Sequence, residues 1–290
     1  MSLSPSELVT NADGSIYHLN LLPQDIAHTI ITVGDPERVK EVSKHFDTIQ
    51  LKKGKREFLT HTGVLNGKRI SVISTGIGTD NIDIVLNELD ALVNIDFESK
   101  TLKENRIRLQ IVRIGTSGAI QPEIPIDSWL LSEYAMGFDG LLHFYENDYE
   151  QYQEIENAFV AHSQWSEKKA RPYIIDFDKE LAKKFSDNRI RLGFTATNTG
   201  FYGPQGRKLR LSPSIDDFTN VLSSFRHNKH QITNLEMETS GIYALSKLLG
   251  HHAISLNCIL ANRVAGTFSK NPSESVEKLI KFTLQKLTSN

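Results

Sequence analysis

The sequence lacks the features that mark secreted, disulfide-stabilised and membrane proteins. It has one cysteine in 290 residues, Cys258, which excludes an intramolecular disulfide and any site with several cysteine ligands. No segment approaches the roughly 18 apolar residues that a membrane helix needs, and no basic stretch followed by an apolar run opens the chain. We therefore expect a cytoplasmic protein without a membrane partner, in which Cys258 is a small buried residue.

Neither sign of charge is in marked excess. The 33 Lys and Arg side chains nearly balance the 35 Asp and Glu side chains, so no overall field attracts nucleic acid and any anion site must be local. The ten histidines include no close ligand spacing apart from the adjacent pair His251 and His252. We therefore expect no structural or catalytic metal site.

Short β-type runs alternate with helical patterns from residue 28 onward, which is typical of an α/β protein. The pair Asn66-Gly67 predicts a two-residue hairpin, so the sheet should be mixed. No repeat or linker divides the chain. We predict a single domain over residues 1–290, with a mixed central β-sheet flanked by helices and with residues 1–16 as a flexible N-terminal segment.

The hydrophobic periodicity also indicates where the elements lie. Strands are expected at residues 28–33, 57–64, 68–74, 108–114, 128–133, 189–197 and 252–261. Helices are expected at residues 36–46, 79–97, 235–249 and 273–287. The polar and weakly patterned segments 145–169 and 208–230 are expected to be surface excursions.

Two glutamates stand in the run NLEMETSGIYAL, at the start of the helix expected over 235–249. At about 100° per residue, Glu238 falls within the apolar stripe of this helix and Glu236 falls on the opposite face. Glu236 is therefore expected to be exposed and to complement the helix dipole. Glu238 lies either at the solvated edge of a core or in a closed pocket, where its carboxylate would accept hydrogen bonds from a pair of ligand hydroxyls.

Two arginines lie beside glycines where a strand ends. Arg113, in the run IVRIGTSG, comes just before an expected glycine-rich turn, and its planar guanidinium suits an oxyanion held there. Arg38 follows Gly34-Asp35-Pro36 in the opening turn of a helix, from which it would point toward an anion near the Gly34 amide. Alternatively, Arg113 is an arginine at a sheet edge and Arg38 is an exposed arginine on a helix, without a role in ligand binding. Arg56 lies in the basic run KGKRE, and this pattern by itself predicts a solvated loop residue.

Seven motifs follow one another along the chain: YHL at 17–19, GDPER at 34–38, REF at 56–58, STGIG at 74–78, RIGTSGAIQP at 113–122, FYGPQGR at 201–207 and EMET at 236–239. Together they resemble the nucleoside phosphorylase family, most closely its uridine phosphorylase branch, from about residue 17 to beyond residue 271. The resemblance implies phosphorolysis of uridine to uracil and ribose 1-phosphate in pyrimidine salvage, with deoxyuridine and thymidine as further candidate substrates.

The resemblance also implies roles for particular residues. The phosphate site would comprise Gly34, Arg38, Arg113, Thr116 and, from a neighbouring subunit, Arg56. The ribose site would comprise Thr116, Met237, Glu238 and, across the dimer interface, His18. The base site would comprise Phe201, Gln205 and Arg207. Catalysis would depend on Arg113, Glu238, Gln205 and Arg207, with phosphate as co-substrate and no organic cofactor. The expected assembly is a homodimer with shared active sites, with a trimer of such dimers left open.

The chain departs from the family pattern at two places. Asn81 stands where bacterial uridine phosphorylases have a serine that helps to hold a monovalent cation, which puts a potassium site at the dimer interface in doubt. The base loop reads Gly203-Pro204-Gln205 where those enzymes usually have Pro-Gly-Gln.

Three alternatives remain open at this stage. The first is a purine nucleoside phosphorylase acting on 6-oxopurines, although Asn262 stands where bacterial purine enzymes have a general-acid aspartate. The second is a nucleosidase, which the arginine set disfavours because water needs no such charge. The third is a nucleoside-binding relative without catalysis.

Overall fold

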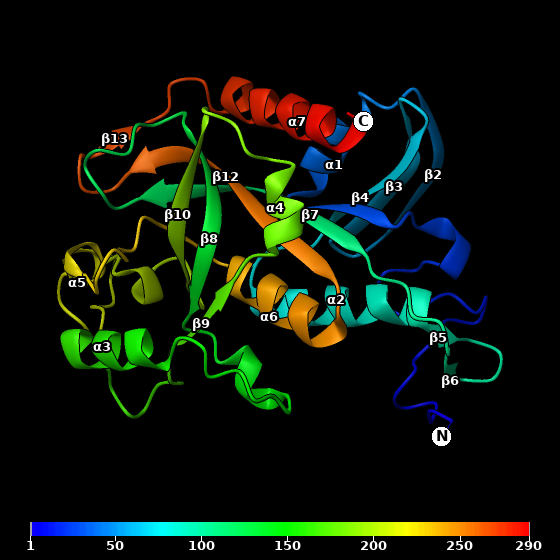
Figure 1. Cartoon of the computed structure of the whole chain (residues 1–290), viewed down its shortest axis with the longest axis horizontal. Coiled ribbons are helices and arrows are strands. Elements are labelled where there is room, and N and C mark those ends of the chain that lie inside the picture. Colours follow the sequence, from blue (N-terminus) through cyan, green and yellow to red (C-terminus); the bar gives the residue numbers. More distant parts are fainter. Residues whose placement is uncertain (1, 290) are drawn as a thin grey trace.

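A computed structural model describes residues 2–289 of the chain, which form a mixed β-sheet with helices on both faces (Figure 1). The strands of the main sheet are β1 (Thr29–Val33), β2 (Thr48–Lys55), β3 (Phe58–Leu65), β4 (Lys68–Ser74), β7 (Gln110–Ala119), β8 (Trp129–Gly137), β9 (Tyr173–Asp176), β10 (Ile190–Thr197), β11 (Asn234–Glu236), β12 (His252–Asn262) and β13 (Thr267–Phe268). A separate hairpin comprises β5 (Ile95–Asp96) and β6 (Thr101–Leu102). The helices are α1 (Pro36–Ser43), α2 (Thr79–Asn94), α3 (Gln153–Ser163), α4 (Lys179–Lys183), α5 (Phe218–Ser224), α6 (Thr239–Leu249) and α7 (Pro272–Thr288). The predicted fold class is confirmed.

The strand order is β13-β12-β8-β10-β11-β7-β1-β4-β3-β2, with β9 beside β8. Because β12 pairs with both β8 and β7, part of the sheet closes on itself. Strands β4, β1, β7 and β12 are parallel, so their carboxyl ends meet at one edge, which is where ligand sites form in such sheets. The hairpin predicted at Asn66-Gly67 joins β3 to β4, with φ of 49° and 76° at its two central residues.

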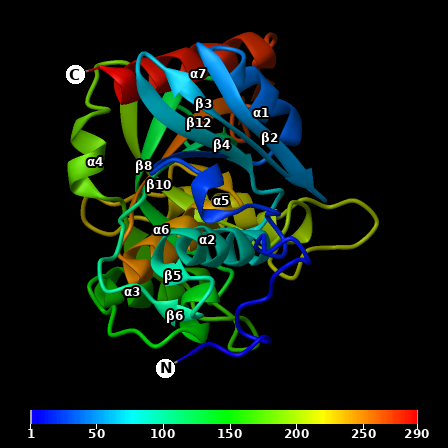
Figure 2. The ribbon, with the colours of Figure 1, turned by 90° about the vertical axis from the view of Figure 1, so that its right-hand side faces the viewer.

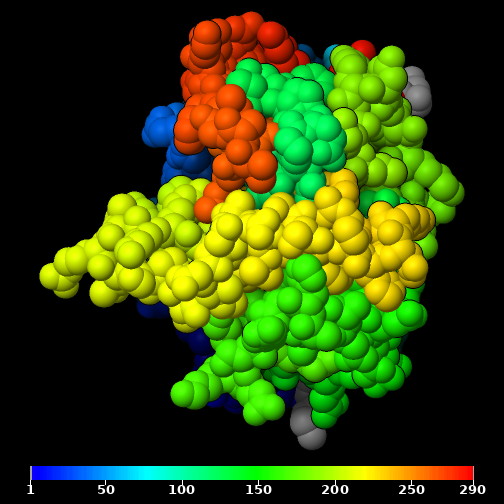
Figure 3. All heavy atoms as spheres, turned by 90° about the vertical axis from the view of Figure 1, so that its left-hand side faces the viewer, coloured from blue at the N-terminus to red at the C-terminus, as the bar shows by residue number. Residues whose placement is uncertain are grey.

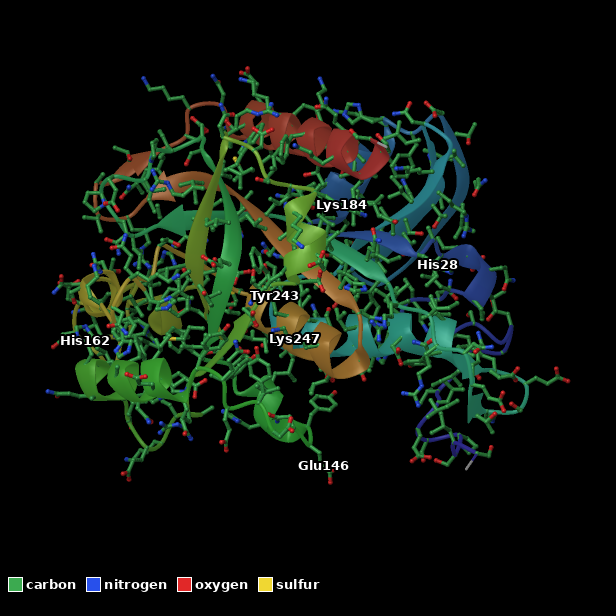
Figure 4. The ribbon with its side chains drawn as sticks, in the orientation of Figure 1. His28, Glu146, His162, Lys184, Tyr243 and Lys247 are labelled. Atoms are coloured by element: carbon green, nitrogen blue, oxygen red, sulfur yellow. The ribbon has the colours of Figure 1, made fainter. Side chains whose placement is uncertain are left out.

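Apolar side chains pack against both faces of the sheet. In Figure 1, α1 and α7 lie on one side of it and α2 and α6 on the other. Helices α1, α4 and α7 share one buried cluster with β1 and β12, and α2 and α6 share a second with β1 and β7. Tyr243 connects α6 to the sheet, because its hydroxyl donates to the Ser132 carbonyl at 2.7 Å and accepts from the Ser255 N–H at 2.8 Å (Figure 4).

The segments 145–169 and 208–230, expected to be surface excursions, contain α3 and α5 instead. Phe159 on α3 and Phe218 and Leu222 on α5 are buried in a third apolar cluster against β8 and β10. Polar and charged residues separate these buried side chains along both segments. The prediction was wrong because this core depends on contacts between the two segments and the sheet.

Two boundaries also differ from the prediction. The helix expected from residue 235 begins at Thr239, because Asn234–Glu236 pairs as a strand with both β10 and β7. Strand β7 does not end in a turn at residue 114 but continues to Ala119, since β12 and β11 pair with its second half.

Residues 2–16, which were expected to be a flexible segment, contact the rest of the chain; Met1 lies outside the described residues. Leu8 and Ile16 are buried in the cluster under α2, and the Leu3 N–H donates to the Lys100 carbonyl at 2.8 Å. Figure 2 shows this segment beside α2 and the β5–β6 hairpin. Within residues 2–289, no helix combines the length and the apolar character needed to cross a membrane.

Candidate active site

A cavity of about 880 Å³ opens at the carboxyl ends of the parallel strands. Gly34 follows β1, Gly76 follows β4, and Leu260 and Ala261 lie at the end of β12. Of the residues predicted to form the site, those that line this cavity are Gly34, Arg38, Arg113, Thr116, Phe201, Gln205, Arg207, Met237 and Glu238. Four separate segments of the chain thus bring together residues with three cationic groups, a carboxylate and an amide.

Arg113 lines this cavity and is only 5% exposed. Its Nη2 donates to Glu238 Oε2 at 2.5 Å, and its Nη1 donates to Asn257 Oδ1 on β12 at 3.0 Å. The guanidinium folds back over Gly115, so closely that a Cβ on Gly115 would lie 1.7 Å from Nη1. Burial disfavours the charged guanidinium, but the neighbouring carboxylates of Glu236 and Glu238 raise the pKa of Arg113 overall.

Glu238 is buried, as the closed-pocket alternative required. It lines the same cavity as Arg113 and Gln205. Its Oε1 accepts the Gly78 N–H at 2.9 Å, from the turn between β4 and α2, while its Oε2 accepts from Arg113. Burial raises the pKa of this carboxyl, Arg113 lowers it, and the charge of Glu236 raises it further, with a net upward shift. Residual acceptor capacity on both oxygens faces the cavity.

Glu236 is not the exposed helix residue that the helical wheel predicted. It is buried at the end of β11 and lines the cavity, with Oε2 3.2 Å from Arg113 Nη2. The same oxygen accepts the backbone N–H groups of Glu238 and Thr239, both at 2.9 Å, and so caps α6 from outside the helix. The wheel was wrong because it assumed a helix from residue 235, whereas strand pairing holds residues 234–236 extended.

The cationic side of the cavity pairs Arg113 with Arg38. Arg38 comes from the first turn of α1, and its Nη1 lies 3.5 Å from the Ile114 carbonyl oxygen. Burial and the nearby charge of Arg113 lower the pKa of Arg38. Thr116 and Gly34 line the same region. Two guanidinium groups beside a hydroxyl and backbone amides can hold a tetrahedral oxyanion with geometric specificity.

The opposite side carries the loop 201–207. Arg207 donates from Nη1 to Gln205 Oε1 and to the Phe201 carbonyl, both at 2.6 Å, and its guanidinium carbon lies 3.7 Å from the centre of the Phe201 ring. No described residue accepts a hydrogen bond from Gln205 Nε2, so this amide can donate to a ligand. The loop therefore offers an aromatic face, an amide and a guanidinium to a planar heterocycle.

Arg263 positions this loop, a function that the sequence pattern alone did not reveal. Its Nη1 donates to the Gln205 carbonyl at 2.7 Å, and burial, then the charge of Arg207, lowers its pKa to about 10. The adjacent Asn262 does not line the cavity. Its amide donates to the carbonyls of Gln121 and Ile124, so its side chain is committed to the fold.

His18 and Arg56 do not line the cavity of their own chain. Arg56 is exposed in the turn between β2 and β3, with φ of 56°. His18 lies beside the same turn, with its ring centre 6.5 Å from that of Phe58, and its Nδ1 is 2.6 Å from Glu88 Oε1 on α2. Glu88 thus orients the ring and leaves Nε2 without a partner among the described residues. The roles predicted for this pair stay predictions.

Residues 2–289 contain no group of three or more His, Cys, Asp or Glu side chains placed to hold a metal ion. Asn81, the residue that puts a potassium site in doubt, lines the cavity together with Glu57 and Ile77. The Asn81 amide donates to the Ile77 carbonyl at 3.4 Å.

Comparisons with known proteins point to one family. The model of the phosphorylase superfamily matches residues 28–288. The chain is 30% identical to a uridine phosphorylase of Thermococcus kodakarensis, over 89% of this chain and 81% of that protein. It is 28% identical to a uridine phosphorylase of Haemophilus influenzae, over 91% of each. A solved Trypanosoma brucei nucleoside phosphorylase, described as showing uridine phosphorylase activity, superposes with a TM-score of 0.88 and 28% identity, covering 98% of this chain and 100% of that one.

The contact between Arg113 and Gly115 predicts the effect of one added methyl group. In Gly115→Ala the new Cβ must displace the guanidinium, so we expect affinity for inorganic phosphate to fall on the order of tenfold or more, equivalent to about 1.4 kcal/mol. Calorimetric titration with phosphate measures this. Gly118→Ala on the same strand is the matched control, because its Cβ would meet Arg263 at an ordinary 3.6 Å. Equal affinities in the two folded variants would contradict the proposed packing.

Proposed function

The chain belongs to the phosphorylase superfamily, and we propose that it catalyses the phosphate-dependent cleavage of uridine to uracil and ribose 1-phosphate. One observation carries this proposal: a single cavity holds an arginine pair suited to phosphate, a buried carboxylate suited to a sugar diol, and an amide and guanidinium suited to a pyrimidine edge. The relatives named uridine phosphorylase, and the uridine phosphorylase activity of the Trypanosoma brucei protein, support this substrate.

The arrangement of groups suggests how the reaction proceeds. Arg38 and Arg113 hold phosphate on one side of the sugar, and Glu238 accepts hydrogen bonds from the ribose hydroxyls between phosphate and base. A phosphate oxygen forms a bond to C1′ as the bond from C1′ to N1 of uracil breaks, and the bonding electrons leave with the base. Arg207 and the Gln205 amide stabilise the resulting negative charge. Positioning and charge complementarity are the main sources of catalysis.

We further propose that no organic cofactor or catalytic metal takes part. The positive charge that phosphate requires comes from Arg38 and Arg113, whose guanidinium groups stay protonated. The departing base is stabilised by Arg207 in the same way. Gln205 and Arg207 favour a pyrimidine, and the commitment of the Asn262 amide to backbone carbonyls disfavours base recognition by that residue.

A dimer with shared sites explains why His18 and Arg56 lie outside the cavity of their own chain. Both belong to one region, since Lys55 beside Arg56 donates to the Tyr17 carbonyl at 2.6 Å. In a two-fold dimer this region would complete the partner's site, with Arg56 on the phosphate and His18 on the ribose 5′-hydroxyl. Glu88 positions His18 for that contact through Nδ1. A trimer of such dimers would leave these shared sites unchanged.

Substrate assays test the proposed reaction. The protein is incubated with uridine, deoxyuridine, thymidine and inosine, each with and without phosphate, and release of free base is measured. We expect uracil from uridine only when phosphate is present. Base release without phosphate would indicate a nucleosidase, inosine cleavage in preference to uridine a purine enzyme, and binding without cleavage a non-catalytic relative. Each of these outcomes would overturn the proposal.

Subunit mixing tests the shared site. Arg56→Ala and Glu238→Ala should each inactivate a homodimer. A mixed dimer regains one intact site, because the Arg56→Ala subunit has an unchanged cavity and the Glu238→Ala subunit supplies an unchanged Arg56 to it. With random mixing, activity should return to roughly a quarter of the wild-type value. The control mixes Arg56→Ala with His18→Ala, which leaves a defect in both sites and should restore nothing. No recovery in verified mixed dimers of the first kind would argue against sharing.

The pH profile of turnover tests the coupling between the two buried glutamates. Glu238 must be ionised to accept the ribose hydroxyls, so kcat/KM for uridine should fall as pH drops through its pKa. The charge of Glu236 raises that pKa. Glu236→Gln should therefore move the acid limb to lower pH, by about one unit or less. Glu236→Asp keeps the charge and is the control. If the acid limb of the pH profile is unchanged in Glu236→Gln, the titration of a group other than Glu238 determines it.

A further inference from the structure

A second cavity, of about 920 Å³, lies on the other side of the loop 201–207. Its wall includes Phe138, Trp165 and Phe218, and its rim includes Lys169 and Arg210. The chain that follows β10, yellow-green in Figure 3, projects from the surface beside it. We propose that this cavity binds a planar aromatic anion, and that its occupancy is coupled to the base-binding loop.

The wall of this second cavity suits a flat ring. The ring centres of Phe138 and Trp165 are 4.9 Å apart in a stacked arrangement, and that of Phe218 lies 6.0 Å from Phe138. Leu209 and Leu211, which also line the cavity, are 71% and 78% exposed. Exposed apolar side chains beside a hollow offer apolar area that a ligand can cover. An aromatic ligand would cover them and extend the aromatic cluster.

The charges around the second cavity favour an anion. Within residues 2–289, neither Lys169 nor Arg210 has a carboxylate within the 4.0 Å of a salt bridge. Lys169 Nζ instead lies 4.8 Å from the centre of the Trp165 ring, and burial lowers its pKa. The acid of the cavity, Asp139, accepts from the Tyr173 hydroxyl at 2.8 Å and the Ser240 hydroxyl at 2.7 Å. Its single negative charge faces three cationic residues along the cavity lining, Lys169, Arg207 and Arg210. The cavity lining thus carries an excess of positive charge, which favours an anionic ligand.

The two cavities share one side chain. Arg207 lines both, and it contacts Gln205 and Phe201 on the active-site side. Tyr202, Gly203 and Pro204, from the same loop, line the second cavity. An anion that draws on Arg207 would therefore change the hydrogen bond that orients Gln205. By linkage, ligands in the two cavities must then alter each other's affinity by the same factor.

The two tryptophans of the chain allow a direct test of binding. Trp165 lines the second cavity, whereas Trp129 packs against Phe282 with ring centres 5.2 Å apart. Protein labelled with 5-fluorotryptophan should give two ¹⁹F resonances, which Trp129→Phe assigns. On titration with 2-naphthoate we expect a saturable shift of the Trp165 resonance alone. The neutral analogue 2-naphthamide should bind at least tenfold more weakly. An unmoved Trp165 resonance, or equal binding of both compounds, would overturn the proposal.

Variants at the rim test the part played by charge. Lys169→Met combined with Arg210→Gln should weaken 2-naphthoate binding on the order of tenfold, equivalent to about 1.4 kcal/mol. Lys168→Gln, which changes an exposed neighbour that does not line the cavity, is the matched control and should bind normally. Unchanged affinity in the double variant would refute anion recognition by these groups.

Coupling is tested by the KM for uridine, a measurement that rests on the proposed function. Saturating 2-naphthoate should change this KM at least twofold without competing for the active site, and the change should be lost in the rim double variant. Simple competition without a Trp165 shift would mean that the compound binds only in the active site, and would overturn the inference. Orotate and UMP then distinguish a ring-borne carboxylate from a phosphate as the natural anion. A Trp165 shift in a protein that does not cleave uridine would sustain the second site while refuting the proposed reaction.

Discussion

Arg113 is buried between two carboxylates where β7, β11 and β12 meet, and the cost of burying these charges constrains the surrounding structure. Removing one partner from a buried ion pair typically costs about 3–5 kcal/mol, because the other charge is left unpaired. Gly115 has no side chain to obstruct the guanidinium, and Asn257 accepts a hydrogen bond from it. The Gly78 N–H donates a hydrogen bond to Glu238. Each of these contacts comes from a different strand or turn, so the site and the fold depend on the same interactions.

The buried cluster also prepares the site for chemistry. Glu236 binds the backbone at the start of α6 and contacts Arg113, so Glu238 is the carboxylate proposed to accept hydrogen bonds from the substrate. Arg38 and Arg113 concentrate positive charge on one side, and Arg207 and Gln205 present donors on the other. Groups held rigidly before the substrate arrives need little reorganisation as charge develops, which is the general basis of electrostatic catalysis. The second cavity adjoins this arrangement only through the loop that carries Arg207.

Much of the fold follows from local pattern, and the exceptions have a common physical cause. The β3–β4 hairpin and the strands of the parallel core were predictable because Asn66-Gly67 and the apolar runs are signals within a few residues. The cluster of Phe159, Phe218 and Leu222 escaped prediction because it joins two weakly patterned segments. Likewise β11 is too short to show an alternation of apolar and polar residues in the sequence. Its pairing with β10 and β7 places the Glu236 side chain in the interior.

The sequence by itself determined the family, through seven ordered motifs, and the identity of most residues that line the cavity. It also indicated that Glu238 would be buried, although the helix from which this was argued starts one residue later than Glu238. Only the tertiary structure decided that Glu236 shares Arg113, that Asn262 faces the fold rather than the base, and that His18 and Arg56 lie outside the cavity of their own chain. The positions of these side chains depend on contacts between residues far apart in the sequence, and a local sequence pattern does not specify such contacts.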